Sequence, residues 1–348
     1  MKGIGLVFAG GGGKGSYEIG VWKYLHEIGI DQYIRVVSGT SVGALNAALF
    51  VGSSYEVAEE LWLNISQDKI LTPKKITTED IMKWLVANGF HIAMPIMAKF
   101  SKAVSGTIMG MERIAQMILS QINSDHIFSR DVIIEMIKDG VDFNKLQISD
   151  IPCYTTCIRC QGVAVERFKL NKYSDVDITT LLLASSAIPI IFPSEKFHGR
   201  MYCDGGIPVI GDNVPIKPVY ETGVENIIVV HLDRETVIDK NKYPDTNIVE
   251  IIPREDLGST LTGTLDFSEE GASYRLNLGY EDAKKILQPI VDIVIMNAVN
   301  SKILKETQSK NKEFENRRYS LLKQDVKIKE KMKNDGFDSI FDELTKEN

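Results

Sequence analysis

The chain has 348 residues, 44% of them hydrophobic and 25% charged, so it can bury a core without disulfides or metals and is neither collagen-like nor disordered. Lys and Arg number 40 against 47 Asp and Glu, which leaves a net charge of −7. This acidic balance argues against a nucleic-acid partner and against electrostatic adhesion of the whole protein to anionic membranes.

The amino terminus and the cysteines predict a cytoplasmic protein. Residues 3–9 form a short apolar run that ends in four glycines, whereas a secretory signal needs a longer apolar region. No run of about 18 apolar residues predicts a membrane-spanning helix. Three of the four cysteines fall within residues 153–160, which is not the spacing of a secreted disulfide framework.

The first fifty residues predict two strands that alternate with two helices. Residues 3–9 have the composition of a buried strand, and residues 16–28 carry apolar side chains at helical spacing. A second apolar run at 34–37 precedes a helical run at 44–51. This order implies parallel strands joined by helical crossovers.

Later segments predict a helical region followed by more strands and helices. Residues 55–145 have few glycines and hold seven of the eleven methionines. They predict either an ordinary helical layer or a cap over a pocket for an apolar ligand. Further on, we expect strands within 153–168, at 201–206, 226–232 and 248–252, and helices at 181–193, 268–287 and 302–333.

A G-x-S-x-G pentapeptide follows the second predicted strand. Gly39 and Gly43 flank Ser41 at the spacing of a nucleophile elbow, in which the backbone passes close to itself and needs small residues. The strand before it and the helix after it fit that motif. The alternative is a plain strand-to-helix turn capped by serine.

A glycine-rich loop, Gly10–Gly15, follows the first predicted strand. It fits a dinucleotide-binding fingerprint, but the second strand ends without the carboxylate that such a site needs. A P-loop needs Ser or Thr directly after Gly-Lys, and Lys14 is followed by Gly15. The other use of such a loop is an oxyanion hole, in which glycine N–H groups face a developing negative charge.

Two residues could serve as the partner of Ser41. Asp204 stands before Gly205 and Gly206 at a predicted strand end, which is a common turn pattern but also a place for a base. His231 follows it in the Ser-Asp-His order of α/β-hydrolases, so a Ser41-Asp204-His231 triad is an alternative. The cysteines of 153–160 point to opposite faces of a strand, so we expect buried thiols rather than a metal cluster.

These motifs together resemble the patatin-like phospholipase family. Gly10–Gly15 is similar to its oxyanion loop, Gly39–Gly43 to its elbow and Asp204–Gly206 to its aspartate motif. Supporting similarity at 184–189, Phe192-Pro193 and Asn213-x-Pro215 extends the resemblance over residues 3–232. The family implies the α/β class: a three-layer α/β/α fold with a mostly parallel central sheet, a helical insert at 55–145 over the active site and a helical C-terminal extension.

The resemblance also implies roles. Ser41 would be the nucleophile, Asp204 its base without a histidine, and the loop residues Gly10, Gly11, Gly12, Lys14 and Gly15 the oxyanion hole. We expect a lipid acyl hydrolase that acts on phospholipids or other fatty-acyl esters, with no cofactor and no metal. Residues 3–232 would form the catalytic domain and 233–348 a C-terminal region. The alternatives are the histidine-dependent esterase and a non-catalytic module that binds lipid or nucleotide.

The basic segment 302–333 qualifies the overall charge. It holds 11 Lys and Arg against 5 Asp and Glu, a local charge of +6, together with apolar residues such as Leu321 and Leu322. It could be a solvated helix or an interfacial element at the inner face of the membrane.

Overall fold

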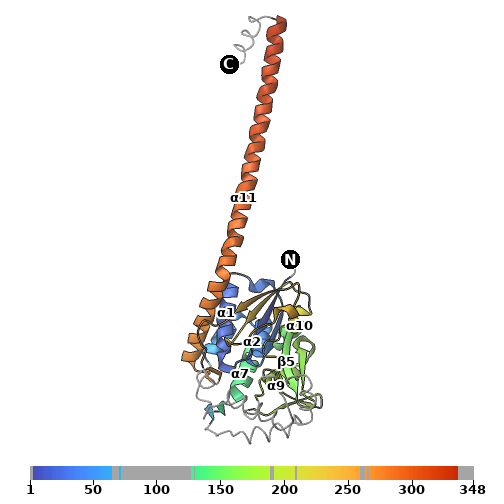
Figure 1. The fold of residues 1–348 in the computed structure, drawn as a ribbon, viewed down its shortest axis with the longest axis vertical. Coiled ribbons are helices and arrows are strands. Elements are labelled where there is room, and N and C mark those ends of the chain that lie inside the picture. The colour runs from blue at the N-terminus through green and yellow to red at the C-terminus, as the bar shows by residue number, and fades with distance from the viewer. Residues whose placement is uncertain are drawn as a thin grey trace. The chain divides into compact units, whose positions relative to one another are not determined.

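A computed structural model describes residues 3–64, 70–71, 127–128, 130–188, 192–207, 210–258, 263–264 and 266–335 (Figure 1). Contacts divide the chain into a compact unit of residues Met1–Ile286 and a second unit, Leu287–Asn348. Most of the predicted cap at 55–145 lies outside the described residues. Its described parts are α3 (Tyr55–Leu63), the β3–β4 ladder (Ile70–Leu71, Ile127–Phe128), α7 (Arg130–Gly140) and α8 (Phe143–Ile148).

The centre of the first unit is an eight-stranded, mostly parallel sheet. Its strand order is β10-β9-β1-β2-β5-β8-β7, and β6 also pairs with β5. The five strands from β10 to β5 are parallel, whereas β6, β7 and β8 are antiparallel to their neighbours. The strands are β1 (Ile4–Phe8), β2 (Ile34–Thr40), β5 (Cys153–Arg159), β6 (Ala164–Lys169), β7 (Glu195–Phe197), β8 (Arg200–Asp204), β9 (Asn226–Val230) and β10 (Asn247–Ile251).

Helices cover both faces of this sheet. Successive residues of a strand point to opposite faces, and β1 carries buried apolar side chains on both. Val7 on β1 and Val36 on β2 pack with Val219 of α10. Leu6 and Phe8 point to the opposite face and are also fully buried. Besides α3, α7 and α8, this unit contains the helices α1 (Ser16–Glu27), α2 (Val42–Gly52), α9 (Asp175–Ser185) and α10 (Lys217–Tyr220), with 3₁₀ turns η1 (Gly12–Gly15), η2 (Asp31–Tyr33), η4 (Leu170–Lys172) and η5 (Lys240–Lys242).

The order in which the chain adds strands to the sheet reverses at β1. From β1 the chain adds β2 and β5 on one side, and later β9 and β10 on the other. Ligands of open α/β sheets bind outside the carboxyl ends of the strands at such a switch point. The loops that follow β1, β2, β9 and β10 therefore mark the place to look for a site.

Three predicted elements differ from the structure. The strand segment 153–168 is a hairpin of β5 and β6, which turns at Gly162 with φ +78°. The helix expected at 181–193 is α9, which begins earlier because the Ser174 side chain accepts a hydrogen bond from Asp177 N and caps it. The two C-terminal helices are one, α11 (Glu269–Asp335), with Pro289 inside it.

The start of α11 packs closely on α1. A Cβ atom on Gly20 would lie 1.8 Å from the carbonyl oxygen of Leu276, and one on Gly279 would lie 2.0 Å from that of Tyr17. The buried Tyr17 hydroxyl donates a 3.0 Å hydrogen bond to Asp282. No helix among the described residues has a stretch long and apolar enough to cross a bilayer.

Candidate active site

Ser41 lies on a sharp turn between β2 and α2. Its backbone has φ 55° and ψ −124°, a conformation that costs a non-glycine residue about 1–3 kcal/mol. A Cβ atom on Gly39 would lie 2.0 Å from Gly43 O, and one on Gly43 would lie 2.5 Å from Phe8 O. Both glycines are therefore required by close backbone contacts, as the elbow motif predicts.

Asp204 meets Ser41 from the end of β8. The Ser41 hydroxyl lies close enough to the Asp204 carboxylate to lower the pKa of that carboxyl, and Gly206 N donates to Asp204 Oδ1 at 2.6 Å. Asp204 is 5% exposed. Burial raises the pKa of its carboxyl to about 6, and the Gly206 hydrogen bond and the Ser41 hydroxyl offset only part of that rise. A base with this pKa is mostly ionised at neutral pH and readily protonated in a reaction.

The glycine loop lies against the serine. A Cβ atom on Gly10 would lie 3.3 Å from Ser41 Cβ, so the absence of a side chain lets the loop approach the nucleophile. Gly12 has φ +60°, which favours glycine, and opens the 3₁₀ turn that leads into α1. The first N–H groups of a helix lack intrahelical partners, so such a loop can bind an oxyanion.

A buried polar network fixes the loop relative to the elbow. Asn46 on α2 donates to Gly15 O at 3.0 Å and to Glu18 Oε2 on α1 at 2.7 Å. Its side-chain oxygen accepts a 3.0 Å bond from the Trp62 indole on α3. Burial raises the pKa of Glu18 well above its usual range. Three helices thereby hold Gly15 beside the start of α2.

The structure adds two supporting residues whose roles the sequence did not reveal. Ser185 Oγ accepts a 2.8 Å hydrogen bond from Ser41 N and donates a 2.7 Å bond to Thr156 O. Asn213 binds Gly10 twice, since its Nδ2 donates to Gly10 O and its carbonyl accepts from Gly10 N. Both lie in segments that carried the family resemblance, and that was the available signal.

A comparison with protein families matches residues 6–220 to the family described as patatin-like phospholipase. The chain belongs to the patatin-like phospholipase family. A 49-residue segment, 14% of the chain, is 47% identical to the lysophospholipase nte1 of Aspergillus terreus and spans 3% of that protein. Over 258 residues, 69% of the chain, it is 24% identical to protein L620 of Acanthamoeba polyphaga mimivirus and spans 64% of it.

Two solved structures are also similar to this member of the patatin-like phospholipase family. VipD from Legionella pneumophila has a TM-score of 0.48 and 16% identity, covering 83% of this chain and 67% of that one. The type III effector ExoU has a TM-score of 0.42 and 18% identity, covering 83% of this chain and 53% of that one.

The structure separates the members of the alternative Ser41-Asp204-His231 triad. His231 follows β9 and Asp204 ends β8, and the strands β1, β2 and β5 lie between β9 and β8. At about 4.8 Å per strand, that places them roughly 19 Å apart, with Ser41 between them. His231 Nε2 instead contacts Glu250 Oε2 at 3.1 Å, and burial lowers the pKa of the imidazole. His231 therefore cannot bridge the serine and the aspartate.

The four cysteines are buried free thiols, as the sequence predicts. Burial is the main cause of the raised pKa values of Cys157 and Cys203, and nearby Asp204 adds to both. Among the residues that the structure describes, no group of three His, Cys, Asp or Glu side chains could hold a metal ion.

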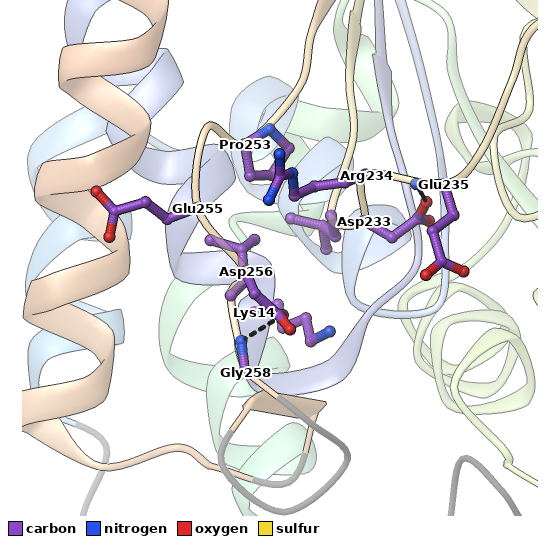
Figure 2. Close-up of a pocket in the computed structure, with 10 residues that line it drawn as sticks. Lys14, Asp233, Arg234, Glu235, Pro253, Glu255, Asp256 and Gly258 are labelled. Atoms are coloured by element: carbon purple, nitrogen blue, oxygen red, sulfur yellow. Dashed lines mark hydrogen bonds between the residues drawn. The ribbon is translucent and has the colours of Figure 1, made fainter.

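A charged cavity of about 520 Å³ lies at the carboxyl ends of β1, β9 and β10 (Figure 2). It is lined by Lys14 from the glycine loop, residues 232–235 after β9, and Pro253 with residues 255–258 after β10. Lys14, expected in the oxyanion loop, thus lines this cavity. An apolar pocket at Ser41 stays a prediction, because most of the cap lies outside the described residues.

Proposed function

We propose that this protein is a lipid acyl hydrolase that cleaves fatty-acyl esters of the phospholipase A or esterase type through a Ser41-Asp204 dyad. The observation that carries the proposal is Ser41 on its strained turn beside the buried Asp204 carboxylate, whose pKa is about 6 and is lowered by the Ser41 hydroxyl. Family membership supports the lipid ester as substrate.

In the acylation step, Ser41 Oγ attacks the ester carbonyl carbon while Asp204 takes the hydroxyl proton. The carbonyl oxygen becomes an oxyanion that the N–H groups of Gly11 and Gly12 stabilise, because the N–H of Gly10, also expected as a donor, is already bonded to Asn213 O. One such donor is typically worth about 2.7–4 kcal/mol. Collapse of this intermediate breaks the bond to the alcohol, which leaves with the proton from Asp204, and the fatty acyl group remains on Ser41.

In deacylation, water is the nucleophile and Ser41 is the leaving group. Asp204 removes a proton from water, the hydroxide attacks the acyl carbon, and the bond to Ser41 Oγ breaks as the serine regains a proton. The free fatty acid is the second product. No cofactor or metal takes part in this scheme.

Replacing the histidine distinguishes the dyad from the triad. For His231→Gln we expect kcat/KM on a fatty-acyl ester within about threefold of wild type, because His231 contacts Glu250 on β10 rather than the dyad. A triad predicts a loss of about 10³-fold or more. The assay is done on protein whose melting curve shows that it is folded, since His231 is fully buried. A loss of the larger size in folded protein would support the triad.

The basic segment 302–333 supports contact with the inner face of the membrane from a cytoplasmic protein. In the second unit, Phe314, Leu321 and Leu322 line a hollow with Arg317 and Arg318, and all of these side chains are exposed. Apolar side chains beside cations suit the boundary between head groups and acyl chains. Each cation near an anionic surface contributes about 1 kcal/mol.

Neutralising three cations of the basic segment 302–333 in the full chain tests that contact. The variant Arg317→Gln/Arg318→Gln/Lys323→Gln should bind vesicles with phosphatidylserine about 100-fold more weakly, measured by co-sedimentation. The matched control changes three exposed lysines of the first unit, Lys172, Lys196 and Lys217, to glutamine. If both variants lose vesicle binding equally, the loss follows from the change in net charge, and a specific role for this segment is rejected.

A further inference from the structure

The charged cavity beside the glycine loop has a feature that the proposed reaction does not use. Its loops follow β1, β9 and β10, the strands at which the chain direction through the sheet reverses. Gly10 of the loop touches Ser41, Gly11 packs on Leu232 of the cavity wall, and Lys14 lines the cavity. One short loop therefore borders both the nucleophile and the cavity.

Six charged side chains line the space, two cations and four carboxylates. Lys14 and Arg234 are the cations, and Asp233 and Asp256 are the carboxylates that act electrostatically on Lys14 (Figure 2). The other two carboxylates are those of Glu235 and Glu255, and Glu255 accepts a 2.7 Å hydrogen bond from Tyr274.

Lys14, Arg234, Asp233 and Asp256 do not neutralise one another directly. Within the described part of the chain, none of these four side chains forms an ion pair. The carboxylates bind their own loops: Asp233 Oδ1 accepts from Thr236 N at 2.6 Å, and Asp256 Oδ1 accepts from Gly258 N at 3.0 Å. Burial lowers the pKa of the Lys14 ammonium, which is the cost of holding a cation there without a direct partner.

From this arrangement we infer that the cavity binds the head group of a zwitterionic phospholipid, a phosphodiester joined to an ammonium group. The phosphate oxygens lie with Lys14 and Arg234, and the ammonium lies with Asp233 and Asp256. A nucleotide polyphosphate would face two carboxylates without a cation of its own to offset them. In a glycerophospholipid, a few covalent bonds join the phosphate to the ester, which suits a cavity that shares a loop with Ser41.

This inference rests on the proposed function for its substrate, and its consequence is a selectivity. In micelles of a neutral detergent, we expect wild type to hydrolyse phosphatidylcholine with a kcat/KM at least about tenfold above that for phosphatidylglycerol. Neutral micelles keep the surface charge constant, so the ratio reports the head group and not the basic segment.

Asp256→Asn tests the cavity directly. The amide keeps an oxygen for Gly258 N, so the loop retains its hydrogen bond while one negative charge is lost. We expect the ratio of phosphatidylcholine to phosphatidylglycerol hydrolysis to fall by about tenfold, with cleavage of a nitrophenyl acyl ester, which has no head group, unchanged. Glu221→Gln, an exposed acid outside the cavity, should leave the ratio as in wild type. An unchanged ratio in Asp256→Asn, or a wild-type preference for phosphatidylglycerol, overturns the inference.

Calorimetry on Ser41→Ala protein separates this inference from the proposed reaction, because it needs no turnover. Glycerophosphocholine should bind Ser41→Ala, and adding Asp256→Asn should weaken binding about tenfold. If Ser41→Ala binds glycerophosphocholine in this way but wild type hydrolyses no ester, the proposed function is rejected and the inference about the cavity stands. Ester hydrolysis by wild type without glycerophosphocholine binding would keep the function and reject the cavity.

Discussion

Ser41→Ala should lower kcat on fatty-acyl esters by about 10⁴-fold or more, while the protein stays folded. The variant removes the attacking oxygen but leaves the glycines that shape the turn. The residual rate should come from the oxyanion loop and from binding alone. The measurement compares initial rates of purified wild type and variant on a phospholipid and on esters of graded chain length.

A matched serine provides the control for that experiment. Ser53 ends α2 but has no place in the dyad, so Ser53→Ala should keep full activity. Equal rates for wild type and Ser41→Ala would show that another group performs the reaction. A strong dependence of the wild-type rate on chain length would also indicate a long apolar groove, which the charged cavity does not supply.

Asp204→Asn should lower kcat/KM by about 10³-fold or more, because the amide keeps the shape but cannot take a proton at neutral pH. The wild-type profile should rise tenfold per pH unit below pH 6 and level off above it, since the pKa of Asp204 is about 6 and its ionised form is the base. The residual rate of Asp204→Asn should lack that rise. A wild-type profile that is flat between pH 5 and pH 7 would contradict this role.

The same pKa predicts that the catalytic carboxylate destabilises the fold. The pKa of Asp204 is about 6 in the folded protein against a usual 3.8, so folding favours the protonated acid. Its stabilising effect is complete below about pH 4 and is lost as the pH rises through 6. The cost at pH 8 is about 3 kcal/mol as an order of magnitude. Asp204→Asn should therefore melt at a higher temperature than wild type at pH 8, and the difference should shrink at pH 4.

Local patterns predicted the parts of the site that depend on close backbone contact. Gly39 and Gly43 were assigned from spacing alone, and the structure shows the carbonyl oxygens that would clash with any side chain there. The alternation of strands and helices at the start of the chain likewise predicted the parallel strands β1 and β2. These features are local, so a few neighbouring residues determine them.

Features that depend on distant segments could not be predicted in the same way. Ser41 and Asp204 are far apart in the chain, so local pattern indicated Asp204 only as one candidate partner, and the resemblance to a family implied the dyad. The position of His231 depends on the strand order, in which β9 joins the far side of β1. The cavity around Lys14 needs the loops after β9 and β10, which no motif marked.

The predicted boundaries of α9 and of the C-terminal helices were wrong. The sequence predicts separate helices at 268–287 and 302–333, but α11 is one helix that continues through Pro289. A proline removes one backbone hydrogen bond and bends a helix without always ending it. The early start of α9 follows from the cap at Ser174, a signal that was present in the sequence but not used.

The most direct test of the account is reaction with a fluorophosphonate, which modifies activated serines, followed by mass spectrometry of the labelled peptides. Wild type should carry the phosphonyl group on Ser41, and His231→Gln should be labelled at a similar rate. Asp204→Asn should be labelled far more slowly, because its serine has lost the base. Absence of label in wild type, or labelling of Ser41 that does not depend on Asp204, would contradict the dyad.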